Sequence, residues 1–333
     1  MSNQPAAVTL SQFARGLSAE TAFDVLAVAR RLKRQGKDVV ELQIGDSPFP
    51  SPAHARAAGI RAIEGHASHY CASLGLPDFR EAIAANYRRE YGVGVTADNV
   101  VVGPGAKVFE QFFCEAILDP GDAVLVFSPH FPTYGPNIER RGARPIYSPL
   151  RQENQFRPDL NDVERFLRTT PRARAIFLNS PHNPTGGVAT AEDLRGLADL
   201  VRGRDVAIFS DEPYCHMVWT GRHHPLPAEP GMLDQAVAAY TFSKSYSMSG
   251  WRLGYAITSP RLAETIGKMI NTTLSCVPPL VQQAGQAALE HDAAERDEIM
   301  QRFRKKVELL VDDLRRVEGV KVLMPAGTFY TFP

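Results

Sequence analysis

The sequence contains little cysteine and tryptophan, with four and two residues among 333. The cysteines, Cys71, Cys114, Cys215 and Cys276, form no close pairs, which excludes a disulfide framework and a metal-thiolate site and predicts a reduced, cytoplasmic setting. No apolar run approaches the length that spans a bilayer. The first ten residues also lack the basic flank and apolar core of a secretory signal. We therefore expect no membrane association.

An excess of charge of either sign is also absent, since 37 basic residues balance 37 acidic ones. No global field draws the chain to nucleic acid or to an anionic membrane, so small molecules are the expected partners. Three histidines, His216, His223 and His224, show no metal-ligand spacing, and we expect no metal site.

The composition is that of an ordinary globular protein, with 44% apolar and 22% charged residues. The length exceeds the size at which one hydrophobic core stops growing, so we expect two domains or one large domain with an appendage.

Short, strongly apolar runs alternate with helical stretches through the middle of the chain. This alternation predicts an α/β fold, a mostly parallel seven-stranded sheet between two layers of helices. The expected strands are Val100–Val102, Ala123–Phe127, Ala143–Tyr147, Ala173–Leu178, Val206–Phe209, Ala236–Phe242 and Leu253–Thr258, and the expected helices lie near 52–66, 77–91, 107–118, 132–141, 159–168 and 190–203.

The large α/β domain is predicted over residues 46–275. Residues 1–45 and 276–333 are predicted to form a smaller, discontinuous α+β domain. Its expected elements are a helix over about 19–35 capped by Ser18, a strand at 38–44, a helix over about 293–317, and strands at 320–324 and 328–332.

One lysine stands out, because the apolar run 236–242 delivers Lys244 to the end of a strand among hydroxyl side chains. A lysine amine can attack a carbonyl to give a Schiff base, and pyridoxal phosphate requires such an attachment together with a cation for its phosphate. Arg252 follows as a candidate for that cation. Taken alone, Lys244 fits better with a solvated surface lysine, which is what most lysines are.

Other loops that follow strands also carry unusual residues, and ligands bind at this edge of such sheets. Gly105-Ala106-Lys107 opens a helix and could seat a phosphate, or be a plain glycine turn. Phe131 could stack on a flat ring or only pack. Asn183 is held between prolines as a donor, and Asp211 ends an apolar strand, where a carboxylate needs a cationic partner.

Together these residues resemble the class I/II aminotransferases, pyridoxal-phosphate enzymes of the aspartate aminotransferase fold (fold type I). The resemblance covers nearly the whole chain in the order of the family, and it rests on Tyr70, Gly105-Ala106-Lys107, Phe131, Asn183-Pro184-Thr185-Gly186, Asp211 with Tyr214, Ser243-Lys244 and Arg252.

The resemblance implies a role for each residue in holding pyridoxal 5'-phosphate. Lys244 is similar to the Schiff-base lysine that also moves the proton, and Asp211 to the aspartate that keeps the ring nitrogen protonated. Asn183 and Tyr214 match residues that hydrogen-bond the phenolic oxygen of the ring. The remaining implied contacts are an aromatic stack by Phe131 and a phosphate grip by Gly105, Ala106, Lys107, Thr241, Ser243 and Arg252.

The resemblance also implies a homodimer, because Tyr70 matches a tyrosine that reaches the phosphate of the neighbouring subunit. Gly45 resembles a glycine whose backbone faces the substrate, and Asn183 is expected to face it too. The implied activity is transfer of an amino group from an amino acid to a 2-oxo acid. Two alternatives stay open: a carbon–sulfur lyase or other elimination enzyme on the same fold, and a cofactor-binding but catalytically impaired fragment or regulatory module.

The sequence departs from the pattern of the family in two places. Thr241 stands where serine or glycine is usual, but the hydroxyl is kept. Family members also run several tens of residues beyond the segment Gly327–Tyr330 and carry there an arginine for the substrate α-carboxylate, whereas this sequence ends at Pro333. We therefore expect the small domain to be incomplete at its C-terminal end.

Overall fold

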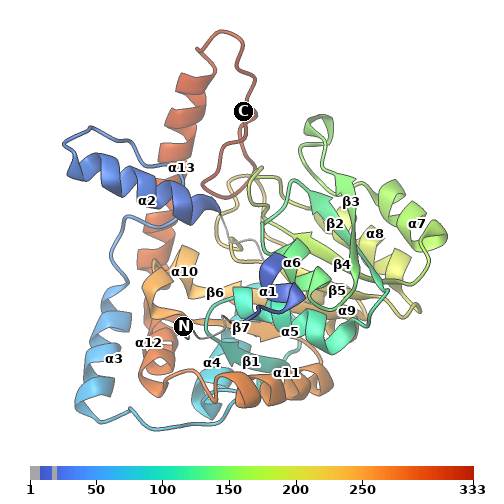
Figure 1. The fold of residues 1–333 in the computed structure, drawn as a ribbon. Helices are drawn as coiled ribbons and strands as arrows, with labels where there is room; N and C mark the ends of the chain where they lie inside the picture. Colours follow the sequence, from blue (N-terminus) through green and yellow to red (C-terminus); the bar gives the residue numbers. More distant parts are fainter. Residues whose placement is uncertain (1–7, 17–20) are drawn as a thin grey trace, which may run out of the picture.

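A seven-stranded sheet forms the centre of the computed structural model, which describes residues 8–16 and 21–333 (Figure 1). The strands lie in the order β1-β7-β6-β5-β4-β2-β3, and only β7 runs antiparallel to its two neighbours. The predicted α/β fold with a mostly parallel sheet is confirmed. The strands are β1 (Val100–Gly103), β2 (Ala123–Ser128), β3 (Arg144–Pro149), β4 (Ala173–Asn179), β5 (Ala207–Asp211), β6 (Ala236–Thr241) and β7 (Gly254–Ile257).

Alternate residues along each strand point to opposite faces of the sheet, and helices cover both faces. One face packs on α5 (Lys107–Ile117), α6 (Tyr134–Glu139) and α11 (Pro260–Thr273). The other face packs partly on α4 (Pro77–Tyr91) and α12 (Pro279–His291), and partly on α7 (Leu160–Thr169) and α8 (Ala191–Val201). Because both faces are covered, the inner strands are largely apolar, and this is why the sequence shows continuous apolar runs, whereas the edge strand β3 is partly exposed.

Local signals set the ends of these helices. Pro77 stands in the first turn of α4, where its missing N–H costs nothing, and Gly92 ends that helix in the left-handed conformation. At α8 the Thr190 side chain accepts from the Asp193 N–H, and the Asp193 side chain accepts from the Thr190 N–H. These caps agree with the predicted bounds.

The remaining helices lie around this core. The long helix α13 (Ala293–Leu314) stands beside α10 (Phe242–Ser245), and α2 (Thr21–Arg34) crosses it in the view of Figure 1. None of the helices in the described part of the chain is long and apolar enough to cross a membrane. The other elements are α1 (Gln12–Gly16), α3 (Ala53–Glu64), α9 (Met232–Gln235), η1 (Ala97–Asn99), η2 (Gln152–Asn154), η3 (Leu226–Ala228) and η4 (Ser249–Trp251).

Three predicted strands are wrong, because residues 38–44, 320–324 and 328–332 pair with no strand among residues 8–16 and 21–333. In the first, Val40 and Leu42 are each 80% exposed, so apolar character there does not mark a sheet. Near the last, an isolated bridge joins Gly327 to Val218. The predicted cap Ser18 lies outside the described residues, and the division into domains 46–275 and 1–45 with 276–333 stays a prediction.

The register of the sheet brings loops from distant parts of the chain to one edge. Asn179 of β4 lies beside Asp211 of β5, at the ends of both strands. Gly254, the first residue of β7, lies between Thr241 of β6 and Gly103 of β1. A Cβ on Gly254 would stand only 2.7 Å from the carbonyl carbon of Gly105, so no larger residue fits. The turn after β6, which carries Lys244, and the turn after β1, which carries Gly105, therefore meet across β7.

Candidate active site

Lys244 lies in the short helix α10, directly after β6 ends. The Thr241 side chain caps this turn by accepting from the Ser243 N–H at 3.1 Å, and the Thr241 hydroxyl donates to Ser243 Oγ at 2.8 Å. Lys244 Nζ donates to the carbonyl oxygen of Gly45 at 2.6 Å. The predicted lysine and the predicted substrate-facing glycine are thus in direct contact.

The amine of Lys244 is poised closer to neutrality than an ordinary lysine. Burial is the main cause that lowers its pKa to about 8, and the nearby charges of Lys107 and Arg252 lower it further. Asp46 and Asp211 act in the opposite direction. A larger share of the side chain is therefore the neutral, nucleophilic amine near neutral pH.

Asp211 lies at the end of β5 and is 6% exposed. Its carboxylate accepts a hydrogen bond from one uncharged side chain. The Tyr134 hydroxyl donates to Asp211 Oδ2 at 2.6 Å. Burial raises the pKa of Asp211 to about 6, although Tyr134, Lys244 and Lys107 each act to lower it. A buried carboxylate of this kind needs a cationic partner.

Tyr214 joins the site through its hydroxyl, which receives a hydrogen bond from Asn183 Nδ2 at 3.5 Å. That hydroxyl also shares a hydrogen bond of 2.9 Å with the Tyr330 hydroxyl. Lys244 Nζ lies 5.8 Å from the centroid of the Tyr214 ring and 5.7 Å from that of Phe329. Aromatic rings therefore wall the lysine on one side.

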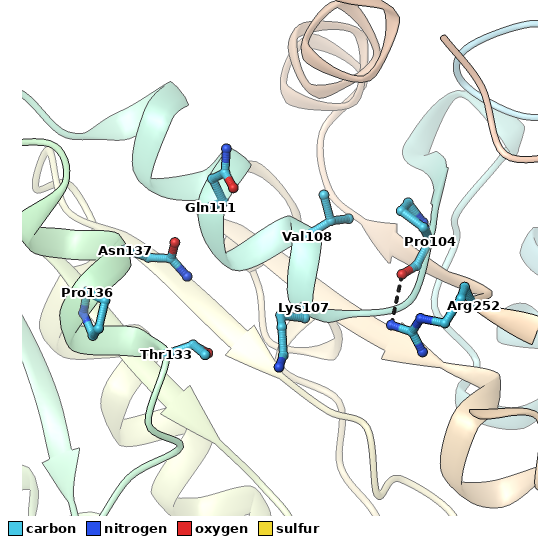
Figure 2. A pocket seen from close by; sticks show the side chains of 8 residues that line it. All are labelled: Pro104, Lys107, Val108, Gln111, Thr133, Pro136, Asn137 and Arg252. Carbon is cyan, nitrogen blue, oxygen red and sulfur yellow. Dashed lines mark hydrogen bonds between the residues drawn. The ribbon is translucent and has the colours of Figure 1, made fainter. Parts of the chain in front are cut away.

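A second group of predicted residues lines a cavity of about 370 Å³ at the start of α5 (Figure 2). Lys107 and Arg252 both line this cavity, and Arg252 donates to the carbonyl oxygen of Pro104 at 3.1 Å. Lys107 Nζ also lies 5.0 Å from the centroid of the Phe131 ring. Two cations at the N-terminal end of a helix make this region suitable for an anion. The other lining residues are Pro104, Val108, Gln111, Thr133, Pro136 and Asn137.

Tyr70 is the predicted residue that this chain does not bring to the lysine. Its side chain lies in the loop between α3 and α4 and is 88% exposed. An exposed tyrosine is what a contact with a second subunit would require, so its predicted role is kept as a proposal.

Sequence reasoning missed four residues of the site: Asp46, Tyr134, Phe329 and Tyr330. Asp46 and Tyr134 act on the charges of Lys244 and Asp211, and Tyr330 bonds to Tyr214. Nothing in their local sequence marks them, because each becomes significant only through a contact with a distant segment. In the structure, the segment that carries Tyr330 is attached to the turn from 183 to 186 by a hydrogen bond from the Gly327 N–H to the Gly186 carbonyl.

Comparisons with known proteins show the family of the chain. Residues 37–333 match the family model of aminotransferases of class I and II. The chain is 32% identical over 89% of its length to an aspartate aminotransferase of Pyrococcus horikoshii, covering 76% of that protein. It is 35% identical over 92% of its length to one of Thermotoga maritima, covering 80% of that protein. A probable aspartate/prephenate aminotransferase of Thermus aquaticus is 34% identical over 96% of the chain, which covers 83% of that relative.

Solved structures give the same result. The Thermus thermophilus aspartate aminotransferase with maleate superposes with a TM-score of 0.91 at 31% identity, covering 96% of this chain and 84% of that one. The fold and these similarities define an enzyme that transfers amino groups. The chain belongs to the class I and II aminotransferase family. It transfers an amino group from an amino acid to a 2-oxo acid, and neither the elimination reaction nor an impaired binding module is favoured by its relatives.

Proposed function

We propose that the protein is a pyridoxal-phosphate-dependent aspartate aminotransferase. The observation that carries the proposal is the buried Lys244 amine, with its lowered pKa, set among a carboxylate, two cations and aromatic rings. The relatives named above supply the choice of aspartate as donor.

The residues present fit the cofactor by their chemistry. A phosphate dianion would suit the charges of Lys107 and Arg252 and the backbone N–H groups at the start of α5, which Gly105 and Ala106 directly precede. The hydroxyls of Thr241 and Ser243, in the turn after β6, are further candidates for this contact. Asp211 suits a protonated pyridine nitrogen, and the flat ring of Phe131 suits stacking on a heterocycle. When bound, pyridoxal phosphate supplies an electron sink for the bond that breaks at the substrate α-carbon.

The side chains of this chain would do the remaining work. Lys244 Nζ would hold the cofactor covalently and would carry a proton to and from the substrate α-carbon. Asp211 keeps a positive charge opposite its carboxylate, and Asn183 and Tyr214 donate hydrogen bonds that orient the ring. The carbonyl of Gly45 accepts from the lysine amine and faces the substrate.

Reduction and mapping test the attachment. We expect the purified protein to be yellow and borohydride reduction to fix the cofactor on Lys244, as peptide mass spectrometry would show. The Lys244→Ala variant should lose both the adduct and turnover. Lys268→Ala is the matched control, because Lys268 lies exposed on α11 in an ion pair with Glu264. An adduct on another lysine would contradict the proposal.

Substrate preference tests the choice of aspartate. We expect kcat/KM with 2-oxoglutarate as acceptor to be highest for aspartate among aspartate, alanine and phenylalanine. The products should be oxaloacetate and glutamate, with no release of pyruvate and ammonia from a cysteine-type donor. A donor preference for alanine or phenylalanine would overturn this choice while leaving the aminotransferase itself in place.

The homodimer and the cytoplasmic setting belong to the same proposal. A mixture of Tyr70→Phe and Lys244→Ala chains tests the shared site. If Tyr70 acts across the interface, a hybrid dimer contains one site with both residues intact, so activity should rise above that of either parent. If Tyr70 acts within its own chain, mixing would restore nothing.

A further inference from the structure

A cluster of charged side chains contacts the turn that carries Lys244. Its residues have none of the roles proposed above. Glu90 comes from α4, His216 from the loop after β5, and Arg296 from α13. Arg296 donates to Glu90 Oε1 at 2.9 Å, and His216 Nε2 lies 3.1 Å from Glu90 Oε2. These side chains are only 8–19% exposed. An ionic cluster of this kind is costly to form and more costly to leave half made.

The cluster touches the turn through His216. Its Nδ1 lies 3.0 Å from Ser245 Oγ, and Ser245 follows Lys244 directly in α10. Ser245 is 1% exposed, so its hydroxyl has no access to bulk water. Arg296 also donates to the hydroxyl of Tyr246, the next residue along, at 3.2 Å. The two residues that follow the lysine are thus both held by this cluster.

The two nitrogens of His216 have different freedom. Nε2 lies 2.8 Å from an Arg296 nitrogen, a contact that requires a lone pair, and 3.1 Å from Glu90, a contact that requires a proton. Nε2 can therefore serve Arg296 when the imidazole is neutral and Glu90 when it is charged. In both of these states Nδ1 carries a proton and lies 3.0 Å from Ser245 Oγ and 3.4 Å from Cys215 Sγ, so it can donate to Ser245. This contact with Ser245 is available whichever partner Nε2 serves.

The helix α13 is the distant end of this connection. It packs against α10, and Figure 1 shows it passing beside that turn. Because Arg296 lies on α13 and bonds to Glu90 of α4, a shift of α13 would change the support of the His216 ring. The ring would then change its hold on the turn that carries Lys244.

We propose that His216 is a positioning residue for Lys244, acting through Ser245, and that Arg296 couples its position to that of helix α13. The catalytic role of Lys244 rests on the proposed function. The contacts that position its amine do not depend on that function. His216 touches neither the substrate nor the cofactor in this scheme. It fixes the rotation of the turn and hence the burial of the amine, which sets the reactivity of that amine.

The experiment measures the reactivity of Lys244 rather than turnover. The full chain, freed of cofactor, is labelled with a small acylating reagent across a range of pH, and the extent of labelling at Lys244 is read by mass spectrometry. His216→Ala and Ser245→Ala should each change the labelling rate on the order of fivefold, the factor that one ordinary hydrogen bond corresponds to. The double variant should show no more than the larger single effect, because both remove one contact.

Two further variants separate positioning from general stability. His216→Asn keeps an N–H donor and should restore most of the labelling profile. Arg296→Gln should act in the same direction as His216→Ala, whereas Arg304→Gln, which removes an exposed ion pair with Glu308 on the same helix, should not. Variants that lower the melting temperature but leave the labelling profile of Lys244 unchanged would overturn the proposal, and so would additive effects in the double variant. Loss of the borohydride adduct in the unsubstituted protein would instead count against the proposed function.

Discussion

Lys244 Nζ donates to the carbonyl oxygen of Gly45, a residue 199 positions earlier in the chain. The contact places the end of β6 against the loop before α3, so one reactive group is held between two distant segments. Position 45 is glycine for a separate, steric reason. A Cβ there would collide with the Tyr330 hydroxyl and stand 2.9 Å from the Phe329 ring.

The reactivity of Lys244 should follow its lowered pKa. In the cofactor-free protein we expect labelling of its amine by an acylating reagent to rise with pH around a midpoint near 8, because burial disfavours the ammonium form. A midpoint near the ordinary pKa of a lysine amine, about 10.4, would contradict the described burial.

Gly45→Ala should disturb the site more than the fold. The added methyl group displaces Tyr330 and Phe329 from the lysine, and overpacking of this kind typically costs about 1–3 kcal/mol. We expect KM for the amino acid to rise and the melting temperature to fall modestly. Gly94→Ala is the control, since a Cβ at that position meets no atom within 4 Å. Identical kinetics of Gly45→Ala and the unsubstituted protein would refute the described packing of Tyr330 and Phe329 against Gly45.

Tyr134→Phe should weaken cofactor binding without leaving a large cavity in the core, because only the hydroxyl is removed. The lost hydrogen bond to Asp211 raises the pKa of that carboxyl further above its ordinary value, so less carboxylate is present at neutral pH. A hydrogen bond to a charged group contributes about 1.5–3 kcal/mol, so the Kd for pyridoxal phosphate should rise about 10- to 100-fold. The loss should be largest at acidic pH. Tyr147→Phe, which removes a half-exposed hydroxyl, should bind as the unsubstituted protein does in a fluorescence titration.

The ionic cluster around His216 should give stability a defined pH window. Burial opposes the charged imidazole, but Cys215 and Glu90 outweigh it and raise the pKa of His216 from 6.5 to about 9. A raised pKa means that its contribution is complete below about pH 6.5 and lost as the pH rises through 9. Arg296 and Tyr246 also face the ring and must be kept unchanged.

The measurement is the difference in melting temperature between the unsubstituted protein and His216→Asn. The pKa of Glu90 is lowered to about 2, because its bonds to His216 and Arg296 outweigh the burial that would raise it, so its charge persists through the neutral range. The difference should be largest below about pH 6.5, decrease as the pH rises from 6.5 to 9, and be lost above pH 9. A difference that stays constant across this range would show that the ring acts only by packing.

The sheet was predictable from the sequence because both of its faces are buried. All seven strands match apolar runs, and α4 matches its predicted range because proline and glycine mark its two ends. The runs at 38–44, 320–324 and 328–332 looked similar, but a strand also needs a neighbour with free N–H and C=O groups. No neighbour is in place there, and composition cannot show that.

The site was only partly predictable for a related reason. Asp211 ends a strand and Lys244 and Asn183 lie in the turns that follow strands, where the fold places ligand contacts, so their positions carry information. Tyr134, Tyr330 and His216 act through contacts with residues that lie far away in the sequence. Their hydroxyl and imidazole groups gain meaning only when the register of the strands and the packing of α13 are known.

Gly254 lies on the short strand β7, whose neighbours β1 and β6 lead into the two turns that carry Gly105 and Lys244. Strand β7 thus works as a spacer of fixed width between them. Slipping it by one residue would turn each of its side chains toward the opposite layer of helices and carry Arg252 away from Pro104. A single insertion at this point would then leave every proposed active-site residue in the sequence and still disassemble the place where they meet.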